Sequence, residues 1–304
     1  MSDIRRVDFG SPFKDRFSDS LELWLPQMRA NLADILMFPA TLIPKENRKV
    51  GFAVAAGPSA EKNVHLLKGR EDGVICCADR AGAAYGDFFQ TFYVGTSDPS
   101  PVVAKFYEKM VIPKAAIMSI FTHQQTVLAA KRRKIPRYYY TPALKDDKDR
   151  ELKLINKLLL TLTEAPLMMG VSDSGSLAWR ILVGLGCTTI GLVGFDMSEP
   201  YDRPFRLWSL YPAYLQYMRR NGIEDVEKMK GMMNVRRYTH PTFGNDYWTD
   251  VSWDSYRGKF LTLLEHGLKQ GIKTINCSEA GSLYTEWLPC MKLEKFLAEQ
   301  LPSY

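Results

Sequence analysis

Residues 170–196 read GVSDSGSLAWRILVGLGCTTIGLVGFD, and this stretch decides the fold. A turn of glycine and small hydroxyl residues leads into a helix expected over 174–186, and an apolar strand is expected from Thr188 to Phe195. A strand that is apolar throughout, without alternation, is typical of a parallel sheet covered on both faces. A helix that runs directly into such a strand is the repeating unit of α/β proteins.

The same alternation of short apolar runs and longer helical segments extends along the chain. Further strands are expected at Val50 to Ala56, Val74 to Ala78, Thr91 to Gly95, Ala115 to Ile120, Arg137 to Tyr140 and Ile272 to Cys277. Further helices are expected near 20–38, 60–69, 99–111, 146–162 and 252–270. The pattern predicts an α/β, Rossmann-like fold with a mainly parallel sheet of six or seven strands flanked by helices.

The expected elements divide the chain into three parts. Residues 1–45 form an N-terminal helical extension, residues 46–290 the Rossmann-like domain, and residues 291–304 a C-terminal helix. Residues 200–250 are rich in Tyr, Trp, Arg and Met without a clear strand, so we expect a helical lid insertion there. Whether residues 1–45 pack on their own chain or on a neighbour stays open.

Composition narrows the functional class. The 304 residues are 46% apolar and 24% charged, which supports a folded core and excludes intrinsic disorder. No run approaches the roughly 18 apolar residues of a membrane span, and the N-terminus lacks the apolar core of a signal peptide, so we expect a cytoplasmic protein. A net charge of +6 is too mild to predict a nucleic-acid partner, but it suits anionic small molecules.

Four common kinds of site are not supported by the sequence: a metal site, a dinucleotide-binding site, a P-loop and the nucleophile elbow of an esterase. The five cysteines have no C-x-x-C spacing and the four histidines are scattered, so we expect reduced thiols and no metal site. The dinucleotide-binding motif G-x-G-x-x-G does not occur, and neither does the P-loop motif G-x-x-x-x-G-K-[ST]. Position 174 is serine where the nucleophile elbow of an esterase needs its final glycine.

Ligands of α/β sheets bind beyond the carboxyl ends of the strands, so the residues that follow each strand are the candidates. Gly57 follows the first strand and allows a ligand to approach the backbone, while Ser59 precedes a helix whose free amides favour phosphate. A plain strand-to-helix turn is the alternative. On the ligand reading, Gly57→Val is expected to crowd the ligand and leave folding mostly intact, provided that the turn tolerates a Cβ.

Carboxylates and small residues follow the later strands. Asp79 follows the second strand, where it can accept hydrogen bonds from ribose hydroxyls or nucleobase amines, and Asp98 follows the third; helix capping is the alternative for both. Asp196 closes an apolar strand, a costly place for a charge without a partner or ligand. The predicted nucleotide-binding residues are Gly57, Pro58, Ser59, Asp79, Asp98, Ser174, Gly175 and Ser176.

The expected lid contains the remaining candidates. His240 lies in Arg236-Arg237-Tyr238-Thr239-His240-Pro241, where it is a candidate acid or base, with a structural loop histidine as the alternative. Arginines beside aromatic residues are costly to bury without an anionic partner. The predicted phosphate and lid residues are Tyr201, Arg203, Arg236, Arg237 and Tyr238.

Five motifs in order carry a family resemblance: AGPS at 56–59, ADRA at 78–81, SDPS at 97–100, the stretch 172–196 and INCSEAG at 275–281. This order resembles that of the bacterial motility-associated factors, which are flagellin glycosyltransferases. It equally resembles the archaeal 6-hydroxymethylpterin diphosphokinase MptE-like proteins. The resemblance covers roughly residues 25–290 and implies a nucleotide-binding transferase domain.

A more distant resemblance is to the small bacterial sialyltransferases, which use a CMP-activated sugar. That resemblance implies that the predicted nucleotide-binding residues hold CMP and that Asp196 shapes the floor of the site. It also implies that Tyr201 or Tyr238 touches the phosphate, and that His240 is the general base on the acceptor hydroxyl. The implied partners are a CMP-linked nonulosonic acid donor and a hydroxyl acceptor.

Two alternatives to sugar transfer stay open. The first is transfer of diphosphate from ATP to a pterin alcohol, which normally needs Mg²⁺ held by carboxylates. The archaeal family has an Asp-x-Asp-Gly cluster after the third strand, whereas residues 97–100 here hold one carboxylate, which favours sugar transfer. The second alternative is a nucleotide-binding module without catalysis. Mg²⁺ as a cofactor and a homo-oligomer also stay open.

Overall fold

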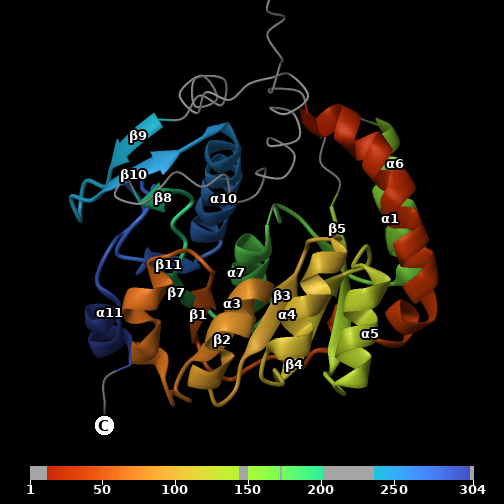
Figure 1. Cartoon of the computed structure of the whole chain (residues 1–304), viewed down its shortest axis with the longest axis horizontal. Helices are drawn as coiled ribbons and strands as arrows, with labels where there is room; N and C mark the ends of the chain where they lie inside the picture. The colour runs from red at the N-terminus through yellow and green to blue at the C-terminus, as the bar shows by residue number, and fades with distance from the viewer. Residues whose placement is uncertain (1–11, 144–149, 172, 201–235, 302–304) are drawn as a thin grey trace, which may run out of the picture.

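The computed structural model describes residues 12–143, 150–171, 173–200 and 236–301 (Figure 1). Within these residues an eight-stranded sheet has the order β11-β7-β1-β2-β3-β4-β5-β6, and every pair in it is parallel. Its strands are β1 (Val50–Val54), β2 (Val74–Ala78), β3 (Tyr93–Thr96), β4 (Ala115–Ser119), β5 (Arg137–Pro142), β6 (Leu167–Met168), β7 (Thr189–Val193) and β11 (Lys273–Asn276). The predicted Rossmann-like α/β fold is confirmed.

The one strand of this sheet that the sequence analysis missed is β6. It has only two residues and directly follows Pro166, so it gives no apolar run that can be recognised. Each of the other strands begins and ends within two residues of its expected limits, because most of them are apolar over nearly their whole length. In β2 and β4 all five residues are buried, as expected for central parallel strands.

Helices cover both faces of the sheet. Alternate residues of β1 point to opposite faces: Phe52 and Val54 join one apolar core, and Ala53 joins the other. The helices on the Phe52 face are α1 (Pro12–Met37), α2 (Ala60–Asn63), α3 (Asp79–Tyr85), α4 (Ala104–Lys109), α5 (Gln124–Arg132), α6 (Arg150–Thr163) and α11 (Leu293–Gln300). The helices on the Ala53 face are α7 (Ser174–Leu185) and α10 (Val251–Lys269).

Short 3-10 helices connect several of these elements. They are η1 (Ala40–Leu42), η2 (Val64–Leu67), η3 (Gly86–Phe88) and η4 (Pro101–Val103). No helix in the described part of the chain is long and apolar enough to span a membrane. The three-part division of the chain remains a prediction.

The described part of the N-terminal extension packs on its own chain. Asp34 of α1 accepts two hydrogen bonds of 2.5 Å from the Arg137 guanidinium of β5, and one of 2.7 Å from the Tyr139 hydroxyl. Lys131 of α5 lies 3.0 Å from the same carboxylate. Burial alone would raise the pKa of Asp34, but the hydrogen bonds from Arg137, Tyr139 and Lys131 outweigh it and lower the pKa to about 2.

The strand order reverses between β1 and β7. Strands β2 to β6 follow β1 on one side, whereas β7 and β11 lie on its other side. Loops that leave the sheet at such a reversal diverge to opposite faces, and ligands of α/β proteins bind in the crevice between them. The ends of β1 and β7 are therefore the first place to look for a site.

A second, smaller sheet corrects the expected helical lid. Strands β8 (Glu199–Pro200), β9 (Arg236–Thr239) and β10 (Asp246–Thr249) form an antiparallel sheet in the order β8-β10-β9. The expectation of a helical insertion without strands is wrong for residues 236–249. Strand β9 is short, and its side chains are mostly polar and largely exposed. It therefore lacks the apolar run that identifies the strands of the main sheet. Residues 201–235 lie outside the described part.

Candidate functional site

The ends of β1 and β7 are joined by a buried carboxylate. The Ser59 amide donates a hydrogen bond of 2.9 Å to Asp196 Oδ2, and the Ser59 hydroxyl donates to Asp196 Oδ1. Asp196 is only 2% exposed. Its position at the end of an apolar strand is explained by this partner, which supplies the hydrogen bonds that a buried charge requires.

Gly57 is required by packing between these two turns. Its amide donates to the Gly194 carbonyl at 3.0 Å, and a Cβ at position 57 would lie 2.4 Å from that same oxygen. It would also lie 2.7 Å from Asp196 Cγ. The expectation that Gly57→Val leaves folding mostly intact is inconsistent with this contact, because backbone and a buried carboxylate cannot move aside cheaply.

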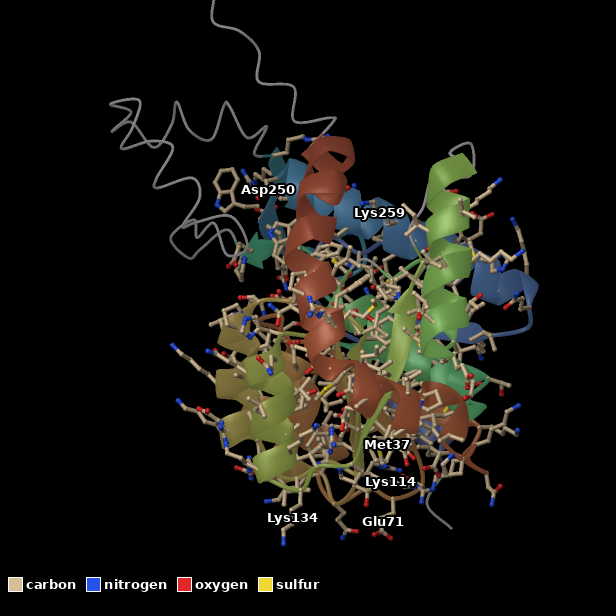
Figure 2. The ribbon with its side chains drawn as sticks, turned by 90° about the vertical axis from the view of Figure 1, so that its right-hand side faces the viewer. Met37, Glu71, Lys114, Lys134, Asp250 and Lys259 are labelled. Atoms are coloured by element: carbon tan, nitrogen blue, oxygen red, sulfur yellow. The ribbon has the colours of Figure 1, made fainter. Side chains whose placement is uncertain are left out.

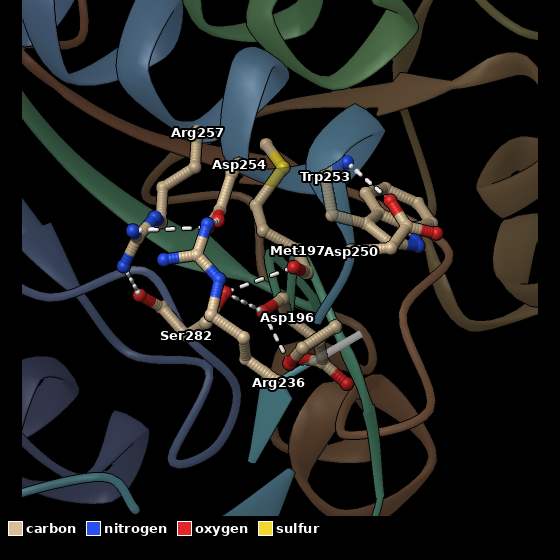
Figure 3. A network of polar contacts seen from close by, with 9 residues as sticks. Asp196, Met197, Arg236, Asp250, Trp253, Asp254, Arg257 and Ser282 are labelled. Carbon is tan, nitrogen blue, oxygen red and sulfur yellow. Dashed lines mark hydrogen bonds and ion pairs between the residues drawn. The ribbon is translucent and has the colours of Figure 1, made fainter. Parts of the chain in front are cut away.

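The loop after β11 supports the Asp196 backbone. The Ser278 hydroxyl accepts a hydrogen bond from the Phe195 amide at 2.9 Å, and the Ser282 amide donates to the Asp196 carbonyl at 2.7 Å. Figure 3 shows Ser282 between Asp196 and Arg257, whose guanidinium donates to the Ser282 carbonyl at 3.2 Å. The INCSEAG motif therefore holds the end of β7 in position.

A second polar group gathers the ends of β2 and β3 with the start of α7. The Ser174 hydroxyl donates to Asp79 Oδ2 at 3.1 Å, and the Ser97 and Ser174 hydroxyl oxygens are 3.2 Å apart. The Arg80 amide donates to Asp79 Oδ1 at 2.7 Å. The ends of β2 and β3 are thus linked through the Ser174 hydroxyl at the start of α7.

The surroundings of the Asp79 carboxyl raise its pKa. Burial raises its pKa to about 6, and the negative charge of Asp98 adds to this increase against the hydrogen bonds from Arg80 and Ser174. Asp98 is exposed, and its Oδ1 accepts a hydrogen bond from the Ser100 amide at 2.8 Å. Asp79 therefore changes charge close to neutral pH, which is common for groups at functional sites.

The start of α7 is closed by its own capping box. Asp173 Oδ1 accepts a hydrogen bond from the Ser176 amide at 2.9 Å, and the Ser176 hydroxyl accepts one from the Asp173 amide at 3.1 Å. A Cβ at Gly175 would lie 3.0 Å from Phe195 Cε1, so this glycine allows α7 to pack against the end of β7.

The two polar groups share one edge of the sheet. Strand β1 lies between β7 and β2, and neighbouring strands are roughly 5 Å apart. Burial raises the pKa of the nearby Tyr85, the charges of Glu61 and Asp196 raise it further, and the charge of Arg80 lowers it. Ser59 and Ser174 therefore lie on the same carboxyl edge. The ligand contacts predicted for this edge remain predictions.

His240 is buried in the turn between β9 and β10. Its Nδ1 accepts hydrogen bonds from the amides of Thr242 at 3.1 Å and Phe243 at 3.3 Å. The tautomer that satisfies these bonds carries its proton on Nε2, and Nε2 has no hydrogen-bond partner within the described residues. Burial lowers the pKa of the imidazole, which keeps it neutral.

The predicted phosphate and lid residues are only partly described. Arg236 forms an ion pair with Asp254, and Arg237 with Asp246. The Tyr238 hydroxyl is buried and has no hydrogen-bond partner in the part of the chain that the structure describes. Tyr201 and Arg203 lie outside that part. His240 packs against Tyr284, two residues from Ser282, so the hairpin lies beside the loop that holds Asp196.

Four residues at this edge were not among the sequence-derived candidates. Ser97 and Arg80 stand next to Asp98 and Asp79, so the rule that selects residues after each strand reaches them too. Ser278 and Ser282 lie in and just after INCSEAG, a motif that carried the family resemblance but received no chemical role.

A comparison with protein-family models finds a match for this chain. The model of the family described as "6-hydroxymethylpterin diphosphokinase MptE-like" matches residues 27–202, which include β1 to β7 and both polar groups of the carboxyl edge. No curated protein matches the chain.

Proposed function

The chain belongs to the 6-hydroxymethylpterin diphosphokinase MptE-like family, and from this premise we propose that it is a transferase that binds a nucleotide-activated donor at the carboxyl edge of β1, β2, β3 and β7. Diphosphokinases are transferases, so the family indicates this class of reaction. The observation that carries the nucleotide proposal is the Asp79–Ser97–Ser174 group, which joins two strand ends to the start of a long helix.

This group suits a nucleoside and its phosphate. The Asp79 carboxylate accepts hydrogen bonds from hydroxyls or amines, and the Ser97 and Ser174 hydroxyls both donate and accept them. Helix α7 has twelve residues, and no hydrogen bond within the described residues uses the amides of Ser174 and Gly175. Free amides at the positive end of a helix dipole favour a phosphate oxygen.

We further propose that the transferred group is a sugar, a nonulosonic acid carried by CMP, and that the acceptor is a hydroxyl. Both oxygens of Asp79 already accept protein hydrogen bonds, and its pKa of about 6 leaves it partly protonated near neutral pH. Such a carboxyl is a weak Mg²⁺ ligand. Sugar transfer releases a single nucleoside phosphate, which carries less concentrated charge than the polyphosphate of ATP.

The hairpin supplies donors for this reaction. Tyr238 and His240 are two positions apart on β9 and its turn, and each has a buried polar atom without a partner among the described residues. We propose that the His240 Nε2–H stabilises the negative charge of the leaving phosphate. For the general-base role, Nδ1 would first have to release its two amides and take up the proton.

Transfer of diphosphate from ATP to a pterin alcohol is the second candidate, because the family description names that activity. In that reaction Mg²⁺ would be held by Asp79 and Asp98, and the negative charge of Asp98 already raises the pKa of Asp79. The metal would neutralise the phosphate oxygens. Asp79 would then bind as the deprotonated carboxylate.

The test is a ligand screen followed by a turnover assay on the full chain. CMP, CMP-linked nonulosonic acids, ATP and hydroxymethylpterin are compared by thermal shift, since a ligand of the native state raises the melting temperature. We expect CMP and its sugars to stabilise the protein, and CMP to be released when a hydroxyl acceptor is added. Stabilisation by ATP with pterin and Mg²⁺ would favour the second candidate. Binding of CMP without release would indicate a binding module.

Variants locate the bound nucleotide. Asp79→Asn should raise the CMP concentration that is needed for a given rise in melting temperature at least about tenfold. Asp87→Asn, at an exposed position in η3, should leave that concentration unchanged. If both variants bind CMP equally well, the nucleotide does not lie against Asp79, and the proposed site is wrong.

A further inference from the structure

The hydroxyl of Tyr140, in the second half of β5, is buried and has no hydrogen-bond partner within the described residues. Three other buried tyrosines each have a bonded hydroxyl. Their partners are Glu46 for Tyr93 at 2.5 Å, Thr96 for Tyr107 at 2.8 Å and Asp34 for Tyr139 at 2.7 Å. A buried hydroxyl that makes no hydrogen bond costs free energy, so its presence at this position needs an explanation.

Tyr140 points to the face of the sheet that α7 covers. Its neighbour Tyr139 points the other way, to α1, which stands with α6 in front of the sheet in the view of Figure 2. Tyr140 instead belongs to the core on the Ala53 face, together with Leu177 and Ile181 of α7. Alternation of side chains along the strand accounts for this difference. The Tyr140 side chain therefore lies on the same face of the sheet as α7.

The register of the sheet brings Tyr140 level with the Ser97–Ser174 pair. Tyr140 pairs with Ser119 of β4, and the residue before Ser119 pairs with the residue before Ser97. Ser97 is also on the α7 face, because its hydroxyl oxygen lies 3.2 Å from that of Ser174. Strands β5 and β3 are two spacings apart, about 10 Å, and a tyrosine side chain spans much of that distance. Tyr140 is thus beside the proposed nucleotide site.

The charges around the hydroxyl agree with this placement. Burial raises the pKa of Tyr140, and the negative charges of Asp79 and Asp173 raise it further. The phenol therefore keeps its proton and is a hydrogen-bond donor close to a carboxylate that accepts. A ribose hydroxyl suits such a pair, because it accepts a hydrogen bond from the phenol and donates one to the carboxylate, whereas a phosphate oxygen only accepts.

We propose that the Tyr140 hydroxyl donates a hydrogen bond to a ribose hydroxyl of the bound nucleotide, and that this ribose hydroxyl donates to the Asp79 carboxylate. The inference rests on the proposed nucleotide function and adds a residue that recognises the sugar of the nucleotide. It holds for both candidate reactions, because CMP-linked donors and ATP carry the same ribose. Since the Tyr140 hydroxyl is buried, the ends of the strands move locally when the nucleotide enters. The ligand class is therefore ribonucleotides, in preference to deoxyribonucleotides.

The first test compares two buried tyrosines on opposite faces of the sheet. Tyr140→Phe removes a hydroxyl that makes no hydrogen bond within the described residues, so the melting temperature should stay the same or rise. The dissociation constant for CMP, measured by titration calorimetry, should rise at least about fivefold.

Tyr107→Phe is the matched control. Tyr107 is equally buried but belongs to the core on the Phe52 face, and its hydroxyl is bonded to Thr96. This variant should therefore have a lower melting temperature and an unchanged dissociation constant for CMP. A Tyr140→Phe protein that behaves in the same way as Tyr107→Phe would show that the Tyr140 hydroxyl is structural, and would overturn the proposal.

The second test identifies the group of the ligand that Tyr140 contacts. The natural protein should bind CMP at least about fivefold more tightly than one of its two analogues, 2′-deoxy-CMP or 3′-deoxy-CMP. In Tyr140→Phe this preference should fall to about twofold or less, whereas Tyr107→Phe should keep it in full. A preference that survives in Tyr140→Phe would mean that other groups recognise the ribose, and the proposed contact would be wrong.

ATP and its two deoxy analogues, measured in parallel, separate this inference from the proposed function. If CMP, CMP-linked sugars and ATP all fail to bind, the proposed function is wrong and the Tyr140 contact is wrong with it. If any of them binds but the natural protein shows no preference for a ribose hydroxyl, the nucleotide function stands and only the Tyr140 contact is wrong.

Discussion

The Ser59 amide donates to Asp196 Oδ2 at 2.9 Å across 137 residues of sequence, and this bond joins the turn after β1 to the turn after β7. It lies where the strand order reverses, the usual place for a ligand in this class of fold. The turn that approaches Asp196 is thus fixed before any ligand arrives. A preorganised edge of this kind reduces the cost of ordering the site on binding.

Ser59→Ala should destabilise the protein by about 1.5–3 kcal/mol, because the buried Asp196 loses a hydrogen bond from a hydroxyl. Urea denaturation measures the change. Asp196→Asn in the same background should recover part of the loss, since a neutral amide needs the donor less. If the two substitutions are additive, the Ser59 hydroxyl and the Asp196 carboxylate are not coupled energetically.

Gly57→Ala should be destabilising by several kcal/mol, because its Cβ would lie 2.4 Å from the Gly194 carbonyl oxygen. Gly184→Ala is the matched control: it lies in α7 with open space around a new Cβ, and should stabilise the protein by about 0.5–1 kcal/mol. Thermal or urea unfolding measures both. A Gly57→Ala protein with normal stability would contradict the packing described at this turn.

Asp79→Asn should change stability and nucleotide binding in opposite directions. The pKa of Asp79 is raised from 3.8 to about 6, so the neutral carboxyl is favoured in the folded state. Its contribution to stability is therefore greatest below pH 3.8 and declines as pH rises to about 6. At pH 8 the variant should be more stable by up to about 3 kcal/mol, with the difference vanishing near pH 4, and it should bind CMP more weakly. Melting curves at several pH values test the sign; a variant that is less stable at pH 8 would contradict it.

His240→Asn and His240→Ala should separate catalysis from folding. The Asn side-chain oxygen can accept the Thr242 and Phe243 amides as Nδ1 does, so this variant should keep its melting temperature, whereas Ala should lose about 1 kcal/mol. Both lack Nε2, and both should lose about 10²–10³-fold in turnover if Nε2–H stabilises the leaving phosphate. Retention of full turnover by His240→Asn would remove the imidazole from the mechanism.

His240 also makes the stability of the protein depend on pH. Burial lowers its pKa in the folded state below the ordinary 6.5, so its contribution to stability is present above pH 6.5 and is lost as pH falls below that value. His240→Asn should therefore lose less stability than the natural protein between pH 7 and pH 5. Parallel melting curves of the two proteins measure this difference.

Much of the main sheet was predictable because its strands are buried on both faces. Continuous apolar runs such as Val74–Ala78 specify such strands, whereas β6 has two residues and β9 is mostly exposed. The strand order was not predictable from periodicity, because pairing of β1 with both β2 and β7 depends on contacts distant in sequence.

The sequence predicted the location of the candidate site better than it predicted the roles of the individual residues. The rule that ligands meet the ends of parallel strands selected Asp79, Ser174 and Asp196, which do lie on one edge. It did not reveal that Gly57 is fixed by the Gly194 carbonyl, or that Nδ1 of His240 holds its own turn. Backbone contacts of that kind leave no periodic signal in a sequence.

The central place of β1 has a consequence for biosynthesis. Residues Phe52 to Val54 of this strand are fully buried in the finished protein, yet one of its edges pairs with Thr189–Val193, which leave the ribosome about 140 residues later. At translation rates of about 5–20 residues per second, that edge of β1 remains unpaired for several seconds or more before β7 is synthesised. An unpaired apolar edge is a template for association between nascent chains. Fragments that end before Thr189 should consequently aggregate, and the full chain should depend on chaperones during synthesis more than its finished surface would indicate.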